Sequence, residues 1–251
     1  IGKNLGPTIP LVGDIKNIFD RLLQENISID TTQWIETLHD IKKSTVDHRV
    51  FSDKLVNPML LVQHLSEKMD DDAIYVADVG QNQMMGVRYF KYKRTRSVVT
   101  SGGLGTMGFG LPAAMGAKFG APDRTVCFFT GDGGMQMTIQ ELGTIMQEKL
   151  DVKIIILNNN FLGMVRQWQE LFFHERYSNT IMENPDFVAI AKAYGIAGRT
   201  VEKREELDEA IAEMLNHNGA FVLVANVETC GMVYPMVPAG GSVTNMILGD
   251  K

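Results

Sequence analysis

The sequence predicts an α/β fold, a mostly parallel sheet of about six strands with helices on both faces. From about residue 55 onward, short apolar or β-branched runs alternate with amphipathic helical patterns. Strands that are apolar at nearly every position are typical of parallel sheets, because helices cover both of their faces. We expect strands at 73–79, 96–100, 125–130, 152–157 and 220–227, and a weaker one at 196–201.

Helical patterns separate most of these strands. Asn57 and Pro58 form a cap followed by proline at the first helical position, which predicts a helix over "MLLVQHLSEKM". Further helices are expected at 108–119, 135–149, 163–173, 185–194 and 204–217. In the helix expected at 135–149, an apolar stripe is predicted to face the sheet. The stripe contains Ile139, Leu142, Ile145 and Met146.

Composition limits the function classes. The chain has 251 residues, 45% hydrophobic and 22% charged, which is ordinary for a globular protein. A net charge of -6 without a basic run argues against a nucleic-acid partner. No apolar stretch reaches the roughly 20 residues of a membrane span. Cys127 and Cys230 form no disulfide framework, so we interpret them as buried thiols of a cytoplasmic protein.

The pattern divides the chain into three parts. Residues 1–50 contain two short amphipathic helices, within 13–26 and 31–43, and then a polar linker at 44–53. Residues 51–230 carry the strand and helix alternation of the main domain. The tail at 231–251 is rich in proline and glycine, which fits either a disordered end or a segment that closes over a site.

Polar residues follow two strands that we expect to be neighbours. Asp132 lies among glycines directly after the strand at 125–130, and Asn158–Asn160 follow the strand at 152–157. A right-handed crossover brings both carboxyl ends to one edge of the sheet, where open α/β sheets bind ligands. Alone, an Asp-Gly pair is most simply a turn, and asparagines after a strand are ordinary loop residues. Their joint occurrence indicates a site.

The chemistry of this edge predicts a diphosphate held through magnesium. A glycine-rich turn before a helix offers N–H groups to phosphate. A carboxylate about 4 Å from a phosphate would repel it by roughly 4 kcal/mol at an effective dielectric constant near 20. Both groups can share the site if a cation lies between them, and Mg²⁺ binds carboxylates together with substrate phosphates. Asn159 would add an amide oxygen, and a main-chain carbonyl a further ligand.

A nicotinamide or flavin Rossmann site is the alternative. Gly103, Gly105 and Gly108 satisfy G-x-G-x-x-G after a predicted strand, and Asp132 follows 24 residues later. Two features count against it: the acidic residue lies in a glycine-rich turn of its own, and the asparagine cluster has no role.

Several segments carry a resemblance to a known family. "GDGG" followed by "NN", with 27 positions from Asp132 to Asn159, is similar to the motif of thiamine-diphosphate-dependent enzymes. "GQNQM", "SGGLGTMGFGLPAAMGAK", "GDGGMQMTIQEL", "ILNNNFLGMVRQWQELFFHERYS" and "PMVPAGG" resemble the catalytic subunits of acetolactate synthases (acetohydroxyacid synthases). The resemblance covers nearly the whole chain.

The resemblance implies a set of site residues. Mg²⁺ would be held by Asp132, Asn159 and the main-chain oxygen of Phe161. Met107 would support thiamine in its bent shape. Met164, Val165 and Trp168 would line a 2-ketoacid pocket, although Met164 and Trp168 share a helix face that could equally be core. The full implied cofactor set is Gln81, Asn82, Gly105, Met107, Gly131, Asp132, Gly133, Gly134, Asn159, Phe161, Gly163 and Met164.

The resemblance also implies an activity. Family members decarboxylate pyruvate and condense the two-carbon unit with a second 2-ketoacid, pyruvate or 2-ketobutyrate, in branched-chain amino-acid biosynthesis. A homo-oligomer is expected, a regulatory small subunit is compatible with the family, and FAD is compatible with the full-length enzyme. The first alternative is another thiamine-diphosphate-dependent 2-ketoacid decarboxylase or oxidase. The second, less favoured alternative is the Rossmann oxidoreductase.

Two departures qualify this picture. The family usually has histidine at position 82 and tryptophan at position 85, where this chain has Asn82 and Met85. Asn82 can still donate to a phosphate oxygen. The family's catalytic glutamate belongs to an N-terminal domain that nothing here matches, so we assign no catalytic residue to this chain. Residues 1–25 resemble the end of the middle, flavin-associated domain. We therefore expect the C-terminal portion of a longer enzyme, inactive by itself.

Overall fold

The computed structural model describes residues 1–3, 6–44, 55–229 and 231–249. The chain divides into two compact units, Ile1–Arg49 and Val50–Lys251, and each is described by itself. Cys230 and nearly all of the predicted linker at 44–53 lie outside the described residues.

The first unit contains the two helices expected from its sequence, α1 (Ile15–Gln24) and α2 (Thr32–Ser44). Helix α1 begins after Asp14, whose Oδ1 accepts a hydrogen bond of 3.1 Å from the main-chain N–H of Asn17. Neither helix has a buried residue. The apolar stripe of α2, with Trp34 and Ile41 about half exposed or more, is therefore not covered by described residues.

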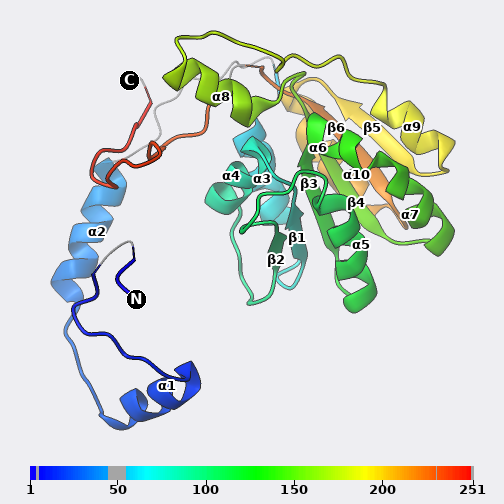
Figure 1. Ribbon diagram of the computed structural model, residues 1–251. Coiled ribbons are helices and arrows are strands. Elements are labelled where there is room, and N and C mark those ends of the chain that lie inside the picture. Colours follow the sequence, from blue (N-terminus) through cyan, green and yellow to red (C-terminus); the bar gives the residue numbers. More distant parts are fainter. Residues whose placement is uncertain (4–5, 45–54, 230, 250–251) are drawn as a thin grey trace. The chain divides into compact units, whose positions relative to one another are not determined.

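The second unit contains a six-stranded, all-parallel sheet in the order β2-β1-β3-β4-β6-β5 (Figure 1). This confirms the predicted fold class, and each strand lies within one or two residues of its expected ends. The strands are β1 (Ile74–Ala77), β2 (Val98–Thr100), β3 (Val126–Gly131), β4 (Val152–Asn158), β5 (Ala197–Val201) and β6 (Phe221–Asn226).

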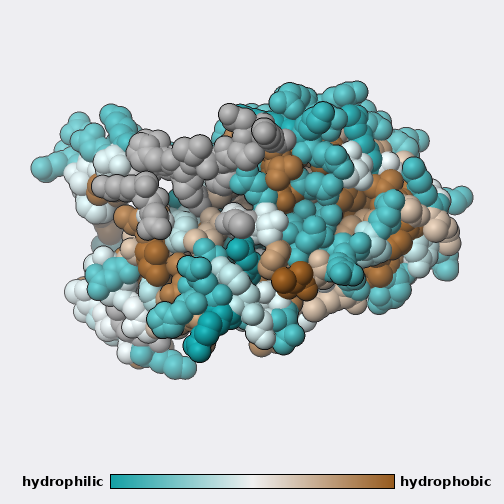
Figure 2. Space-filling view, turned by 90° about the horizontal axis from the view of Figure 1, so that it is seen from above, coloured by the Kyte–Doolittle hydropathy of each residue, from teal (hydrophilic) through white to brown (hydrophobic). Residues whose placement is uncertain are grey.

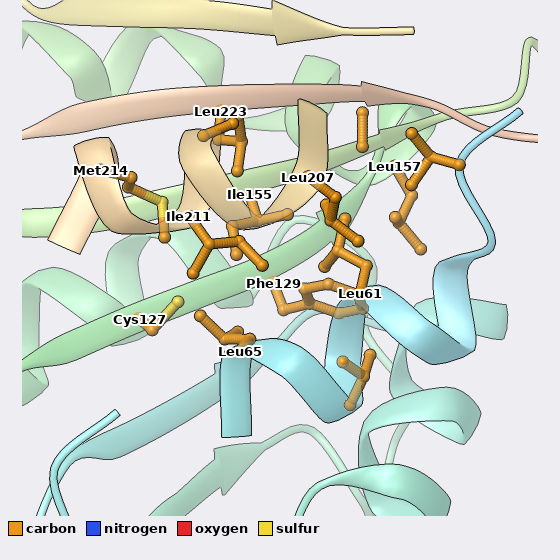
Figure 3. Close-up of a cluster of buried hydrophobic side chains, with 14 of the residues drawn as sticks. Leu61, Leu65, Cys127, Phe129, Ile155, Leu157, Leu207, Ile211, Met214 and Leu223 are labelled. Atoms are coloured by element: carbon orange, nitrogen blue, oxygen red, sulfur yellow. The ribbon is translucent and has the colours of Figure 1, made fainter. Parts of the chain in front are cut away.

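Helices cover both faces of the sheet, which explains why the central strands are apolar throughout. Phe129 and Ile155 point to the face covered by α3 (Pro58–Lys68), α4 (Gln81–Tyr89) and α10 (Leu207–Asn216), as Figure 3 shows for α3 and α10. Phe128 and Ile154, one position earlier in each strand, point to the opposite face. That face packs against α5 (Gly110–Gly120), α7 (Leu142–Glu148) and α9 (Phe187–Ala193).

The predicted helix at 135–149 is interrupted in the structure. Helix α6 (Asp132–Met137) starts at the acidic residue itself, a 3-10 turn spans Ile139–Glu141, and α7 follows. The break falls at Thr138, whose hydroxyl donates to the carbonyl of Gly108 at 3.1 Å. Within α7, Leu142 and Ile145 are buried but Met146 is 51% exposed, so its predicted place on the buried stripe was wrong.

Helix α4 was not predicted, whereas α8 (Gly163–Phe172) was. The buried face of α4 includes the polar residues Gln81 and Asn82, so its sequence lacks an apolar period. None of the helices in the described parts of the chain has the length and apolar character needed to cross a membrane.

The strand order fixes where a ligand can bind. The chain leaves β1 toward β2 on one side and continues through β3 and β4 on the other, so the direction of winding changes between β1 and β3. Open α/β sheets bind ligands in the crevice at the carboxyl ends of the strands that flank such a point. The segments that follow β1 and β3 begin at Asp78 and at Asp132.

Candidate functional site

A pocket of about 620 Å³, including the solvent in its open mouth, lies at the carboxyl ends of β1, β3 and β4. Figure 2 looks onto the end of the molecule at which α8 lies and shows apolar residues set among hydrophilic ones. The pocket brings together every residue of the implied cofactor set except Gly105. Its lining includes Gln81, Asn82, Met107, Gly131, Asp132, Gly133, Gly134, Asn159, Phe161, Gly163, Met164 and Val165.

Asp132 is a buried carboxylate, 1% exposed, held by hydrogen bonds. Its Oδ1 accepts from the N–H of Gly133 at 2.8 Å, and its Oδ2 accepts from the N–H of Asn160 at 2.8 Å and from Nδ2 of Asn184 at 2.7 Å. Burial raises the pKa of Asp132, and these hydrogen bonds oppose the rise. None of the ion pairs between described residues includes Asp132. A buried charge of this kind is suited to a cation.

The neighbouring strand supplies the neutral oxygen ligands. Gly131 pairs with Leu157 in the parallel ladder, so Asp132 and Asn158 occupy equivalent positions at the ends of β3 and β4. Asn159 follows, and its Oδ1 accepts from the N–H of Phe161 at 3.0 Å, which leaves one of its lone pairs open. Within the described residues no three acidic, histidine or cysteine side chains form a metal cluster. A cation here would therefore be bound by one carboxylate with amide and carbonyl oxygens, a donor set that fits Mg²⁺.

The glycine at position 134 is required by close packing. A Cβ at Gly134 would lie 2.3 Å from Oδ2 of Asp78 and 2.9 Å from Oγ1 of Thr130. Both of those side chains are fully buried, so an added methyl group would force one of them to shift within the packed interior. The turn therefore lies directly against the side chain that follows β1.

Asp78 was not identified from the sequence. Its carboxylate accepts from the N–H of Val79 at 2.8 Å and, with both oxygens, from the N–H of Gly108 at 3.0 Å. Gly108 directly follows Met107, so Asp78 fixes the loop that places Met107 at the pocket. Burial raises the pKa of Asp78. The sequence did contain a signal for Asp78, since an aspartate directly follows the apolar run of β1. Aspartate is almost never fully buried without partners, so a buried Asp78 was bound to hold other groups in place.

Two amide side chains that follow β1, those of Gln81 and Asn82, line the pocket and hydrogen-bond to the elements around it. Nε2 of Gln81 donates to Oε1 of Gln167 at 2.8 Å and to the carbonyl of Gly231 at 2.9 Å. Nδ2 of Asn82 donates to the carbonyls of Asp78 at 2.7 Å and Phe129 at 3.2 Å. Both amide hydrogens of Asn82 are thus engaged with main-chain carbonyls, while the residue lines the pocket, and its donation to a phosphate stays a prediction.

The start of the C-terminal tail lies against the pocket. Gly231 lines it, and Val233 exchanges two hydrogen bonds with the side chain of Gln167, at 3.0 and 3.1 Å. Val233 is 3% and Tyr234 is 7% exposed. Residues 231–234 are thus packed on α8 and α4, whereas the assignment of 231–251 as a lid stays a prediction.

The predicted substrate residues separate into two groups. Met164 and Val165 line the pocket. Trp168 does not. It is 37% exposed and packs against Phe172, with ring centroids 5.1 Å apart. Gly105 also lies outside the lining, in the exposed loop before Met107.

The Rossmann alternative does not fit this topology. Gly103, Gly105 and Gly108 follow β2, which is an edge strand, and β1 separates β2 from β3. Asp132 therefore does not lie at the end of a strand next to the glycine loop, as the ribose-binding acid of the dinucleotide fingerprint does.

The fold and the site define an α/β domain with a pocket around a buried carboxylate at the point where the winding of a parallel sheet reverses. Residues 78–225 match the family model for the C-terminal TPP binding domain of thiamine pyrophosphate enzymes. The match covers more than half of the chain, and the chain belongs to this family.

Within this family, the chain is similar to the large subunits of acetolactate synthases. The chain is 40% identical over 240 residues to the acetolactate synthase isozyme 2 large subunit of Escherichia coli, with 95% of this chain and 43% of that protein covered. It is also 40% identical to the probable acetolactate synthase large subunit of Methanocaldococcus jannaschii, over 98% of this chain and 43% of that one. For the large subunit of Lactococcus lactis the identity is 37%, with the same coverage. The chain thus spans less than half the length of these curated relatives.

Proposed function

We propose that this chain is the part of an acetolactate synthase that binds thiamine diphosphate through Mg²⁺. The observation that carries the proposal is the buried carboxylate of Asp132, which has no cationic partner among the described residues and shares a pocket with Asn159. An isolated buried charge is costly, and a divalent cation that also binds a diphosphate offsets that cost. Similarity to acetolactate synthase large subunits supports the choice of enzyme.

Each group in the pocket has a role in this proposal. Asp132, Asn159 and the carbonyl of Phe161 hold Mg²⁺, and the turn at Gly131–Gly134 lets the main chain approach the phosphates. Met107, whose Cε would lie 3.6 Å from a Cβ added at Gly133, orients the thiamine next to this turn. Thiamine diphosphate supplies the carbanion chemistry when it is bound, while the protein binds and orients it.

The substrates follow from the relatives and from the pocket mouth. We infer that Met164 and Val165 contact pyruvate and the second 2-ketoacid, and that Trp168, 37% exposed on the same helix, contacts the acceptor from the rim. The glutamate that activates the cofactor in the family is proposed to come from another part of the full protein, so no catalytic residue is assigned here. A homo-oligomer, a regulatory small subunit and FAD belong to the proposal for the full-length enzyme only.

The binding proposal is tested by thermal unfolding of the full chain with thiamine diphosphate and Mg²⁺. We expect the unfolding temperature to rise only when both are present, and not with NAD. In Asp132→Ala this rise should disappear. Asp123→Ala, an exposed aspartate before β3, is the matched control and should retain it. An equal rise in wild type and Asp132→Ala would contradict the metal assignment.

The reaction is tested separately. We expect the pure chain to form no acetolactate from pyruvate, and to do so when mixed with a polypeptide that carries the preceding domains of a related large subunit. Acetaldehyde as the main product of the mixture would favour a decarboxylase instead. Turnover by the chain alone would contradict the assignment of the catalytic glutamate to another part of the protein.

A further inference from the structure

Asn184, between α8 and α9, reaches the carboxylate that the proposed function assigns to the metal. Its Nδ2 lies 2.7 Å from Oδ2 of Asp132, 2.7 Å from Oδ1 of Asn158 and 3.0 Å from Oδ1 of Asn160. Three oxygens from the ends of β3 and β4 thus converge on one amide nitrogen. Asn184 is distant in sequence from both motifs and does not line the pocket.

The carboxylate of Asp132 fixes the orientation of this amide, because a carboxylate can only accept hydrogen bonds, and Gln136 completes a consistent network on the other side. Nε2 of Gln136, on α6, donates to Oδ1 of Asn184 at 2.7 Å. If the amide of Asn184 were reversed, its oxygen would face the carboxylate of Asp132, and its NH₂ would face the NH₂ of Gln136. The hydrogen-bond network therefore requires that Asn184 present its N–H groups to Asp132.

These contacts make the two oxygens of Asp132 unequal. Oδ2 accepts from Asn160 and from Asn184, so both of its lone pairs are used. Oδ1 accepts from the N–H of Gly133 at 2.8 Å. The main-chain N–H of Asn159 also interacts with the carboxylate and helps to lower its pKa. Oδ2 thus has two short hydrogen bonds and Oδ1 has one, so Oδ1 is the oxygen with more capacity left to bind a cation.

We propose that Asn184 is a positioning residue that occupies Oδ2 of Asp132, so that the carboxylate binds its cation through Oδ1 alone. This inference rests on the proposed function. Binding through one oxygen suits Mg²⁺, which demands a near-ideal octahedron and takes few carboxylate ligands. Ca²⁺ accepts carboxylates that bind through both oxygens and tolerates irregular geometry. Asn184 therefore sets metal preference as well as metal affinity.

The test compares Asn184→Ala with Asn218→Ala in the full chain. Asn218 is an exposed asparagine that precedes β6, at the amino end of the sheet. With thiamine diphosphate saturating, the dissociation constants of Mg²⁺ and of Ca²⁺ are measured by calorimetric titration. For Asn184→Ala we expect Mg²⁺ to bind about 10–100-fold more weakly, as is typical when a partner of a metal ligand is removed. Ca²⁺ should lose clearly less, because the freed Oδ2 can bind it. Asn218→Ala should match wild type.

A second pair of variants guards against a loss of folding. Asn184→Asp keeps the size of the side chain and places a second carboxylate beside Oδ2, so the preference for Ca²⁺ over Mg²⁺ should rise here too, and not in Asn218→Asp. If Asn184→Ala gives no cooperative melting transition, Asn184→Asp carries the same measurement.

The outcomes separate this inference from the proposed function. If wild type binds no Mg²⁺ with thiamine diphosphate, the proposed function fails. If wild type binds Mg²⁺ and the Asn184 variants retain its affinity, or lose Mg²⁺ and Ca²⁺ by the same factor, the positioning role is refuted while the proposed function stands. A loss caused only by general destabilisation would lower both affinities alike and leave the preference unchanged.

Discussion

Replacing Gly134 by alanine tests how closely the turn after β3 is packed against the end of β1. The added methyl group would lie 2.3 Å from Oδ2 of Asp78 and 2.9 Å from Oγ1 of Thr130. These distances are far below van der Waals contact, and both side chains are fully buried. Something must therefore shift, and the nearest atom that can do so is the carboxylate oxygen held by the N–H of Gly108.

Three effects contribute to the expected change in the free energy of unfolding. Alanine is a better helix former than glycine by about 0.8–1.0 kcal/mol, which favours the variant. Inserting a methyl group into a packed interior costs about 1–3 kcal/mol, and losing a hydrogen bond to a buried charged group costs about 1.5–3 kcal/mol. The costs exceed the gain, and we expect Gly134→Ala to destabilise the chain by about 1.5–5 kcal/mol.

Urea denaturation of the metal-free chain measures this change. Gly116→Ala is the control, because Gly116 is exposed within α5 and its Cβ would meet no atom within 4 Å. This variant should be stabilised by about 0.8–1.0 kcal/mol from helix propensity alone. Combining Gly134→Ala with Asp78→Ser should reduce the cost of the alanine, because the two sites are in contact. Equal stabilities of Gly134→Ala and Gly116→Ala would refute the reasoning.

Two more predictions concern buried ionisable groups. Burial raises the pKa of the Cys127 thiol to about 12, so iodoacetamide at about pH 8 should label Cys127 in urea but not in the folded chain, as peptide mass mapping would reveal; equal labelling would contradict its burial. Burial also raises the pKa of Asp78, so the folded chain binds this proton more tightly than the unfolded chain does. The stability due to this group is therefore complete below about pH 4, near the pKa of an unfolded aspartate, and is lost as the pH rises through the raised pKa. Asp78→Asn should therefore weaken the fall of the urea midpoint as the pH rises above about pH 4. An unchanged pH profile would argue against this burial cost.

Most of the fold was predictable because burial on both faces leaves a clear mark on a strand. Val126 to Thr130 and Val152 to Leu157 are apolar or β-branched almost without exception, and they form β3 and β4 at the centre of the sheet. Helix α4 was missed for the opposite reason. Its buried face binds main-chain groups and other amides through Gln81 and Asn82, and such a face has no hydrophobic period.

The functional edge was predictable where its residues follow strands. The positions of Asp132 and Asn159 after two successive apolar runs indicated a shared edge, and the parallel pairing of Gly131 with Leu157 accounts for their proximity. The resemblance implied a place in the 2-ketoacid pocket for Met164, Val165 and Trp168; Met164 and Val165 line the pocket described here and Trp168 does not. A shared helix face did not reveal this difference, because a helical period gives the direction of a side chain and not what lies opposite it.

The sequence by itself determined the fold class, the edge of the sheet that carries the site, and the carboxylate and amide at its centre. Each of these depends on order along the chain: an apolar run, a turn, a helix, the next run. Only the tertiary structure decided which residues hold that centre in place. Asp78 reaches Gly108 across 30 positions, and Asn184 reaches Asp132 across 52. Such contacts depend on how loops fold back over the sheet. Local patterns in a single sequence therefore do not predict which distant N–H group will hydrogen-bond to a buried carboxylate.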